Sequence, residues 1–234
     1  DMVFLRHIAI ISVFLMNSYV IAKSFRTNSA QVYNAPEWLK PYRLQKIAEK
    51  VQYKLEWSTR RVKVYWYFTN SEFVKHHSLG SGAVAVTVSR GKQSIVHLGP
   101  KVNNSNFDQI FAHELVHVII NQKYKGAIPK WLEEGFANHL AKKSTVDYAW
   151  LLKQPFPDDV KSLSHPFKGG KKLIRYRYIA SQALVEMLEK KCDLTNLLRL
   201  SVQRKMDNYI KSYCEIKDLN VAFRAWVQEK AKGI

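Results

Sequence analysis

The sequence predicts an α+β fold, in which a small, mostly antiparallel sheet precedes a mainly helical half. Runs rich in β-branched and aromatic residues fall at 61–68, 83–88 and 94–99, which is the composition and length of strands. From about residue 105 onwards, apolar residues recur at helical spacing. Strands first and helices afterwards is the order typical of α+β proteins. With 234 residues, 47% of them hydrophobic, the chain is long enough for one domain with a buried core.

The N-terminal segment, residues 1–22, has the features of a secretory signal peptide. Arg6 and His7 precede an apolar stretch that ends in Val-Ile-Ala, a pattern that signal peptidases recognise. We expect cleavage after about Ala22 and a periplasmic or secreted mature protein without a stable transmembrane helix. The alternative is a protein anchored to the membrane by its N-terminus. The apolar stretch 8–22 is shorter than the roughly 20 residues that a membrane-spanning helix needs.

The first elements of the predicted domain, residues 36–234, are a helix and three strands. Residues 23–35 are polar and lack periodicity, so we expect them to form a flexible leader. Within 36–57 the apolar residues recur near helical spacing. Of the three predicted strands, the last two are joined by a hairpin turn at Arg90-Gly91-Lys92.

The rest of the chain is predicted to be helical. Ser105 and Asp108 resemble a capping box, which predicts a helix that starts there and runs to about Lys123. Gly126 ends this helix, and Pro129 suits the first turn of the next one. Further helical stretches are expected at 129–143 and 145–153, then, after a long loop at 154–172, around 175–191, 194–205 and 218–231.

Two compositional features bear on compartment and partners. Cys192 and Cys214 fit an oxidising compartment, either as a disulfide or as two buried thiols. They do not form a C-x-x-C pair, which argues against a cysteine zinc site. The chain has 37 Lys and Arg against 19 Asp and Glu, a formal charge of +18. This excess attracts polyanions. Because secretion disfavours nucleic acid as a partner, we expect an anionic envelope component as the partner. The alternative is that the basic faces are solvated and have no specific partner.

The segment His113-Glu114-Leu115-Val116-His117 matches the pattern H-E-x-x-H. Positions i and i+4 share one face of a helix, so both histidines can bind one zinc ion, with Glu114 beside them to hold a water molecule. The alternative is a core helix whose histidines have hydrogen-bond partners. A catalytic zinc site needs a third protein ligand. Glu133 or Glu134 can supply it, because the next helix follows a tight turn and must pack against the first.

The two motifs together, H-E-x-x-H and Trp131-Leu132-Glu133-Glu134-Gly135-Phe136-Ala137, resemble those of the gluzincin metallopeptidases. This group includes the thermolysin and aminopeptidase-N types, and the compact bacterial peptidase MA-like family is similar in layout. The resemblance implies a zincin-like fold with the H-E-x-x-H helix between sheet and helical half. It also implies one Zn²⁺ held by His113, His117 and Glu134, the Glu before Gly, with Glu114 as general base. Glu133 takes a position often held by Asn.

Three further residues are candidates for supporting roles. Asn138 lies four residues after Glu134, on the same helix face, where it could support a ligating histidine from behind; an ordinary surface Asn is the alternative. The segment YRYIASQALVEML resembles the aminopeptidase-type helix whose Tyr stabilises the tetrahedral intermediate. Tyr178 matches that Tyr, with Tyr176 as the fallback and a packed tyrosine as the alternative. The remaining histidines are expected to be surface or packing residues: His76, His77, His97, His139 and His165.

The sequence therefore predicts a periplasmic or secreted zinc metallopeptidase that acts on a peptide or protein substrate. It contains no G-x-M-E-N segment, the aminopeptidase signature, which favours endopeptidase over aminopeptidase action. One alternative is a non-catalytic envelope-binding protein with a structural or vestigial zinc site. Another is a DNA-associated H-E-x-x-H protease, which requires that residues 1–22 do not direct secretion.

Overall fold

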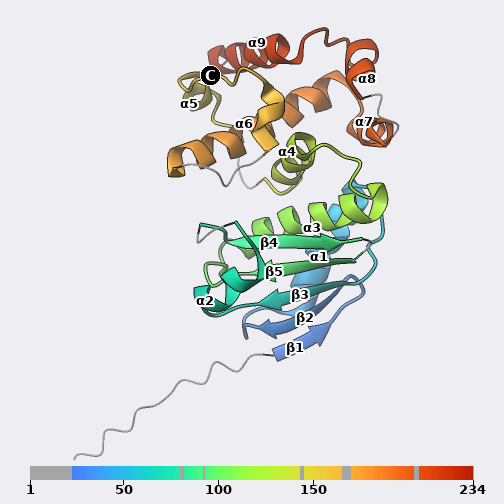
Figure 1. Ribbon diagram of the computed structural model, residues 1–234, viewed down its shortest axis with the longest axis vertical. Coiled ribbons are helices and arrows are strands. Elements are labelled where there is room, and N and C mark those ends of the chain that lie inside the picture. Colours follow the sequence, from blue (N-terminus) through green and yellow to red (C-terminus); the bar gives the residue numbers. More distant parts are fainter. Residues whose placement is uncertain are drawn as a thin grey trace, which may run out of the picture.

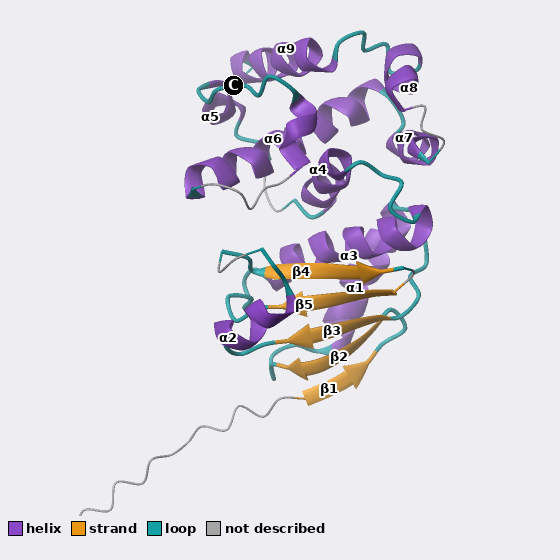
Figure 2. Ribbon diagram, viewed as in Figure 1, coloured by secondary structure: helices purple, strands orange, loops and turns teal. Residues whose placement is uncertain are grey.

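The computed structural model describes residues 23–79, 82–91, 93–142, 145–164, 170–202 and 206–233. The chain is α+β, as the sequence predicts: a five-stranded sheet with helices on one face forms one half, and a helical layer forms the other (Figure 1, Figure 2). The predicted signal peptide, residues 1–22, lies outside the described residues. Within them, no helix combines the length and apolar character needed to cross a bilayer.

The sheet is mixed, so the expectation of a mostly antiparallel sheet is wrong. Its strand order is β1-β2-β3-β5-β4. The outer pairs β1–β2 and β4–β5 are antiparallel, whereas β2–β3 and β3–β5 are parallel. Parallel neighbours need a crossover, and the first helix provides it between β2 and β3. The strands are β1 (Lys23–Arg26), β2 (Ala30–Ala35), β3 (Val62–Trp66), β4 (Ala85–Arg90) and β5 (Gln93–Leu98).

The predicted flexible leader, 23–35, is also wrong, because β1 and β2 occupy it. Ala30 and Val32 are fully buried on the helix side of the sheet. Tyr33 pairs with Tyr65 of β3 and stacks on its ring at 4.6 Å on the other side. The strand is therefore stabilised by a neighbour far away in sequence, a contact that local composition does not reveal.

Two long helices pack on the sheet: α1 (Pro41–Lys54) and α3 (Phe107–Tyr124). The capping box predicted for α3 is wrong. Its N-cap is Asn106, which makes no side-chain cap bond, and the Ser105 hydroxyl instead donates to Asn103 Oδ1 at 2.7 Å. The helix ends at Tyr124, and its C-cap, Lys125, has a left-handed φ of 52°. Buried residues lie all around α3 because it is enclosed by the sheet, α1 and the helical half.

The helical half contains a close helix–helix contact at Gly135. A Cβ atom at this position would lie 2.5 Å from Val185 Cγ2 and 3.0 Å from the Ser181 carbonyl oxygen. The glycine thus permits the close approach of α4 to α6. The helices of this half are α4 (Lys130–Leu140), α5 (Tyr148–Leu152), α6 (Lys171–Lys191), α7 (Leu194–Ser201), α8 (Met206–Ser212) and α9 (Leu219–Lys232). Short turns are α2 (Asn70–Phe73), η1 (Val74–His76) and η2 (Val160–Ser164).

A disulfide links the two cysteines, which settles the choice that the sequence left open. Cys192 follows α6 and Cys214 follows α8, with their Cα atoms 4.9 Å apart. The bridge closes a segment that contains α7 and α8. The helix predicted around 194–205 is shorter than expected, and α8 was not predicted.

Candidate metal centre and active site

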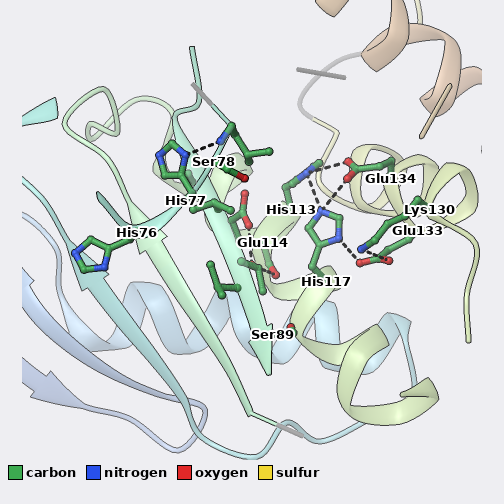
Figure 3. A pocket seen from close by; sticks show the side chains of 15 residues that line it. His76, His77, Ser78, Ser89, His113, Glu114, His117, Lys130, Glu133 and Glu134 are labelled. Carbon is green, nitrogen blue, oxygen red and sulfur yellow. Dashed lines mark hydrogen bonds and ion pairs between the residues drawn. The ribbon is translucent and has the colours of Figure 1, made fainter. Parts of the chain in front are cut away.

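Three side chains from α3 and α4 converge at one point: His113, His117 and Glu134 (Figure 3). The two Nε2 atoms lie 3.2 Å apart. Glu134 Oε2 lies 3.7 Å from His113 Nε2, and its Oε1 lies 3.7 Å from His117 Nε2. The ligand atoms all fall within 4.8 Å of one another. This group, predicted from the two motifs, is close enough to bind a metal ion.

The spacing of these atoms fits a metal ion. An ion that binds two imidazoles tetrahedrally at about 2.0–2.1 Å separates their nitrogens by roughly 3.3–3.4 Å, and the observed separation is 3.2 Å. The electrostatics also favour positive charge here. Burial lowers the pKa of His117, but Glu134 and the hydrogen bond to Glu133 outweigh burial and raise it to about 9. The carboxylates thus attract a cation to this position, either a proton or a metal ion.

A carboxylate holds the back of His117. His117 Nδ1 donates to Glu133 Oε1 at 2.7 Å, and Lys130 Nζ donates to Glu133 Oε2 at 2.8 Å. Burial raises the pKa of Glu133, but the hydrogen bond and charge of His117, with Lys130, bring it down to about 2. An ionised Glu133 fixes the proton on Nδ1 and leaves Nε2 to face the metal position. The sequence alone did not predict this role, since it offered Glu133 only as a possible metal ligand.

Asn138 lies behind the other histidine. Its Nδ2 donates to Ser181 Oγ at 2.8 Å, and that hydroxyl donates to the Tyr178 carbonyl oxygen at 3.0 Å. Burial, followed by the neighbouring His117, lowers the pKa of His113 to about 3, while a side-chain hydrogen bond with Asn138 acts in the opposite direction. A hydrogen bond that raises the pKa of a histidine is one that the ring donates, so the Asn138 carbonyl oxygen is the acceptor from His113. The structure places Asn138 where the i+4 spacing predicts it.

Glu114 stands beside the metal-ligand group and not within it. Its side chain is buried, and Thr87 Oγ1 on β4 donates to Oε2 at 2.6 Å. Burial raises the pKa of Glu114, although His117 and the Thr87 hydrogen bond work against this increase. Nothing in the sequence around Thr87 predicted this contact, since the two residues lie on different elements.

The two candidate tyrosines on α6 point in different directions. The Tyr178 ring centroid lies 6.0 Å from that of His113, and the side chain lines a cavity next to Glu114. Tyr176 lies two residues earlier, about 200° around the helix. Its hydroxyl is buried with no hydrogen-bond partner among the described residues, and it lines neither cavity at the site. This arrangement favours Tyr178 over the fallback, Tyr176, for a role at the site.

The site opens into a cleft of about 580 Å³, walled by β4, α3, α4 and the segment His76–Leu79 (Figure 3). His76 and His77, expected as ordinary surface or packing residues, lie in this wall. His97 and His139 are packing residues: both are buried, with Tyr67 and Glu189 as respective partners. His165 lies outside the described residues. A mainly apolar cavity of about 310 Å³ also borders His113 and Glu114. Its described lining residues include Val84, Ala85, Ile110, Asn138, Ile174 and Tyr178.

Comparison with known protein families, curated proteins and solved structures finds no match to this chain. Function is therefore argued from the site itself. The site combines a two-histidine, one-carboxylate cluster suited to one metal ion with a buried carboxylate next to it. A cleft and an apolar cavity adjoin this group. Such a set of residues can activate water beside a bound carbonyl group.

Proposed function

We propose that the protein is a periplasmic or secreted zinc metallopeptidase that hydrolyses internal peptide bonds. The observation that carries the proposal is the convergence of His113, His117 and Glu134 with Glu114 buried beside them. Two imidazoles and one carboxylate are a ligand set typical of catalytic zinc, which keeps a further position open. Zinc, when bound, supplies Lewis acidity that activates water and polarises the peptide carbonyl.

Glu114 is the proposed general base. It takes a proton from the attacking water and returns it to the leaving amine. Its burial raises its pKa above the ordinary carboxyl value, which strengthens it as a base. Tyr178 is the proposed donor to the oxyanion, because its side chain reaches the apolar cavity beside His113 and Glu114.

The substrate is proposed to lie along β4. In the described part of the chain, β4 forms one edge of the sheet and also lines the cleft. An extended peptide can therefore add to the sheet through main-chain hydrogen bonds. One of its side chains would enter the 310 Å³ apolar cavity, which favours a substrate with an apolar residue next to the bond that is cut.

The test combines metal analysis with one substitution. Purified protein should contain about one zinc per chain and cleave an unstructured protein such as casein. Glu114→Gln should retain zinc and lose hydrolysis, because it removes only the base. The matched control is Glu229→Gln, which replaces an exposed carboxylate on α9. This variant should contain zinc and cleave casein as the wild type does.

The second candidate is a non-catalytic envelope-binding protein with a structural zinc site, which the charge of +18 favours. A buried, unligated carboxylate such as Glu114 has no use in that case. If the zinc-loaded wild type cleaved no peptide but bound anionic lipid or polysaccharide, this second function would replace the first.

A further inference from the structure

A third hollow near the site has a basic rim and an apolar floor. This cavity of about 530 Å³ lies between α1, the start of α3 and the end of α4. We name it the basic groove. Its cationic lining residues are Arg43, Lys46, Lys50 and Lys142, and its apolar lining residues are Ile47, Val51, Ala112, Leu140 and Ala141.

The charges of the basic groove are only partly balanced by the protein itself. Its described lining includes one carboxylate, Asp108, and this residue is paired with Arg43 Nε at 2.7 Å. Lys46, Lys50 and Lys142 are exposed, and among the described residues none of them forms an ion pair with a carboxylate, in contrast to Lys130 and Lys161. The groove therefore carries a surplus of positive charge, which an anionic ligand would complement.

The basic groove adjoins the proposed active site. It shares Gln109 and Ala141 as lining residues with the apolar cavity beside His113 and Glu114. Ala141 is small, and Gln109 is an exposed, flexible side chain. A chain that fills the apolar cavity thus needs only to pass these two side chains to reach the lysines.

We propose that the basic groove binds an acidic segment of the substrate polypeptide, to one side of the bond that is cut. This inference rests on the proposed function, because it extends the same binding site. Contact with the apolar cavity at Gln109 and Ala141 favours a polypeptide ligand over a lipid surface. The apolar floor adds contact area for side chains between the acidic residues. Substrates would then be selected for an apolar residue followed or preceded by a run of carboxylates.

The test measures binding and needs no turnover. The zinc-loaded Glu114→Gln protein is titrated into fluorescein-labelled peptides that share one apolar anchor residue. A run of aspartates stands before the anchor in the first peptide and after it in the second, and asparagines replace them in two controls. The groove adjoins the site in one direction, so only one of the two aspartate peptides can place its carboxylates there. That peptide should bind more tightly than its asparagine control. The difference should shrink as salt is added.

Charge removal then locates the contact. Lys46→Gln combined with Lys50→Gln should weaken binding of the preferred aspartate peptide at least about threefold and leave the asparagine peptides unchanged. Lys211→Gln combined with Lys232→Gln is the matched control, since these exposed lysines lie on α8 and α9 (Figure 1). Both pairs of substitutions lie on the surface, and circular dichroism should show that both double variants are folded.

Three outcomes overturn the proposal. The aspartate and asparagine peptides could bind with equal affinity, or the two lysine double variants could lose the same affinity for the aspartate peptide. In the third outcome, Lys46→Gln with Lys50→Gln weakens binding to anionic lipid vesicles and leaves peptide binding unchanged. The last would assign the groove to a membrane surface. If the wild type cleaved no peptide but the aspartate peptide bound through Lys46 and Lys50, only the proposed catalytic function would be refuted. The basic groove would still be supported as a binding site for acidic peptides.

Discussion

The hydroxyl of Thr87 donates to Oε2 of Glu114 at 2.6 Å and lies 3.1 Å from the main-chain oxygen of the same residue. Thr87 belongs to β4, the strand proposed to hold the substrate, and Glu114 belongs to α3, the helix that carries both histidines. One short contact therefore connects the strand at the cleft to the proposed general base. Any shift of β4 would also shift the orientation of the carboxylate.

Replacing Thr87 with Val should lower kcat roughly tenfold or more and leave KM nearly unchanged. The substitution keeps the shape of the side chain and removes a hydrogen bond to a charged group, which is worth about 1.5–3 kcal/mol. Steady-state kinetics on a fluorogenic peptide measure the effect, and zinc content should remain the same. Thr87→Ser keeps the hydroxyl and should restore most of kcat. A valine variant with normal kcat, or a serine variant as slow as valine, would contradict this role for Thr87.

Glu133 should control how tightly the ion is held. Glu133→Ala removes the acceptor of His117 Nδ1 at 2.7 Å and should weaken zinc affinity about 10- to 100-fold. Glu133→Gln keeps a hydrogen-bond acceptor but removes the charge, so this variant should lose less zinc affinity than Glu133→Ala. Competition with a chromogenic chelator measures both, with Glu229→Gln as a control for a lost surface carboxylate. Unchanged affinity in the alanine variant would show that Glu133 is not needed to orient His117.

Gly135→Ala should destabilise the fold by about 1–3 kcal/mol, because an added methyl group overpacks a filled interface. Its Cβ would lie 2.5 Å from Val185 Cγ2. Denaturant unfolding measures the change. Combining Gly135→Ala with Val185→Ala should recover part of the loss, since it frees space at the same contact. If Gly135→Ala alone were as stable as the wild type, α4 and α6 would be able to move apart without lowering the free energy of unfolding.

The sequence predicted the parts of this protein that are encoded locally. His113 and His117 are one turn apart on one helix, and Glu134 follows in a motif of its own, so the metal cluster did not depend on knowing the sheet. The strand around Val32 was missed because its neighbour, β3, lies beyond the whole of α1. The Thr87 contact was missed for the same reason. The partners of both residues are set by tertiary packing, which a pattern within a short window does not contain.

The disulfide should contribute about 3 kcal/mol to the free energy of unfolding. Cys192 and Cys214 are separated by 22 positions, and a crosslink over that distance restricts the unfolded chain by about this amount. Cys192→Ser with Cys214→Ser, followed by urea unfolding, measures it. Adding a reductant should lower the stability of the wild type and leave the double variant unaffected. If the double variant matched the oxidised wild type, the bridge would be dispensable for stability.

Acid should destabilise the protein through His97 on β5, a buried residue that is not one of the proposed metal ligands. The ring is buried, and its Nδ1 lies 2.8 Å from the Tyr67 hydroxyl. Tyr65 on β3 also faces it, as does His76 at the end of η1. Burial, with smaller effects from His76 and His77, lowers the pKa of His97 from 6.5 to about 4.

Because this folded-state pKa lies below the unfolded value, the unfolded chain binds a proton more readily. The stabilising effect of neutral His97 is therefore complete above about pH 6.5 and is lost as the pH falls from there towards 4. Denaturant unfolding at pH 7 and pH 5 should show a smaller loss for His97→Gln, which has no proton to gain, than for the wild type. The exposed-surface variant Lys232→Gln should lose as much stability as the wild type. Equal losses in all three proteins would mean that other groups account for the acid sensitivity, and that the buried ring is protonated in the folded state without cost.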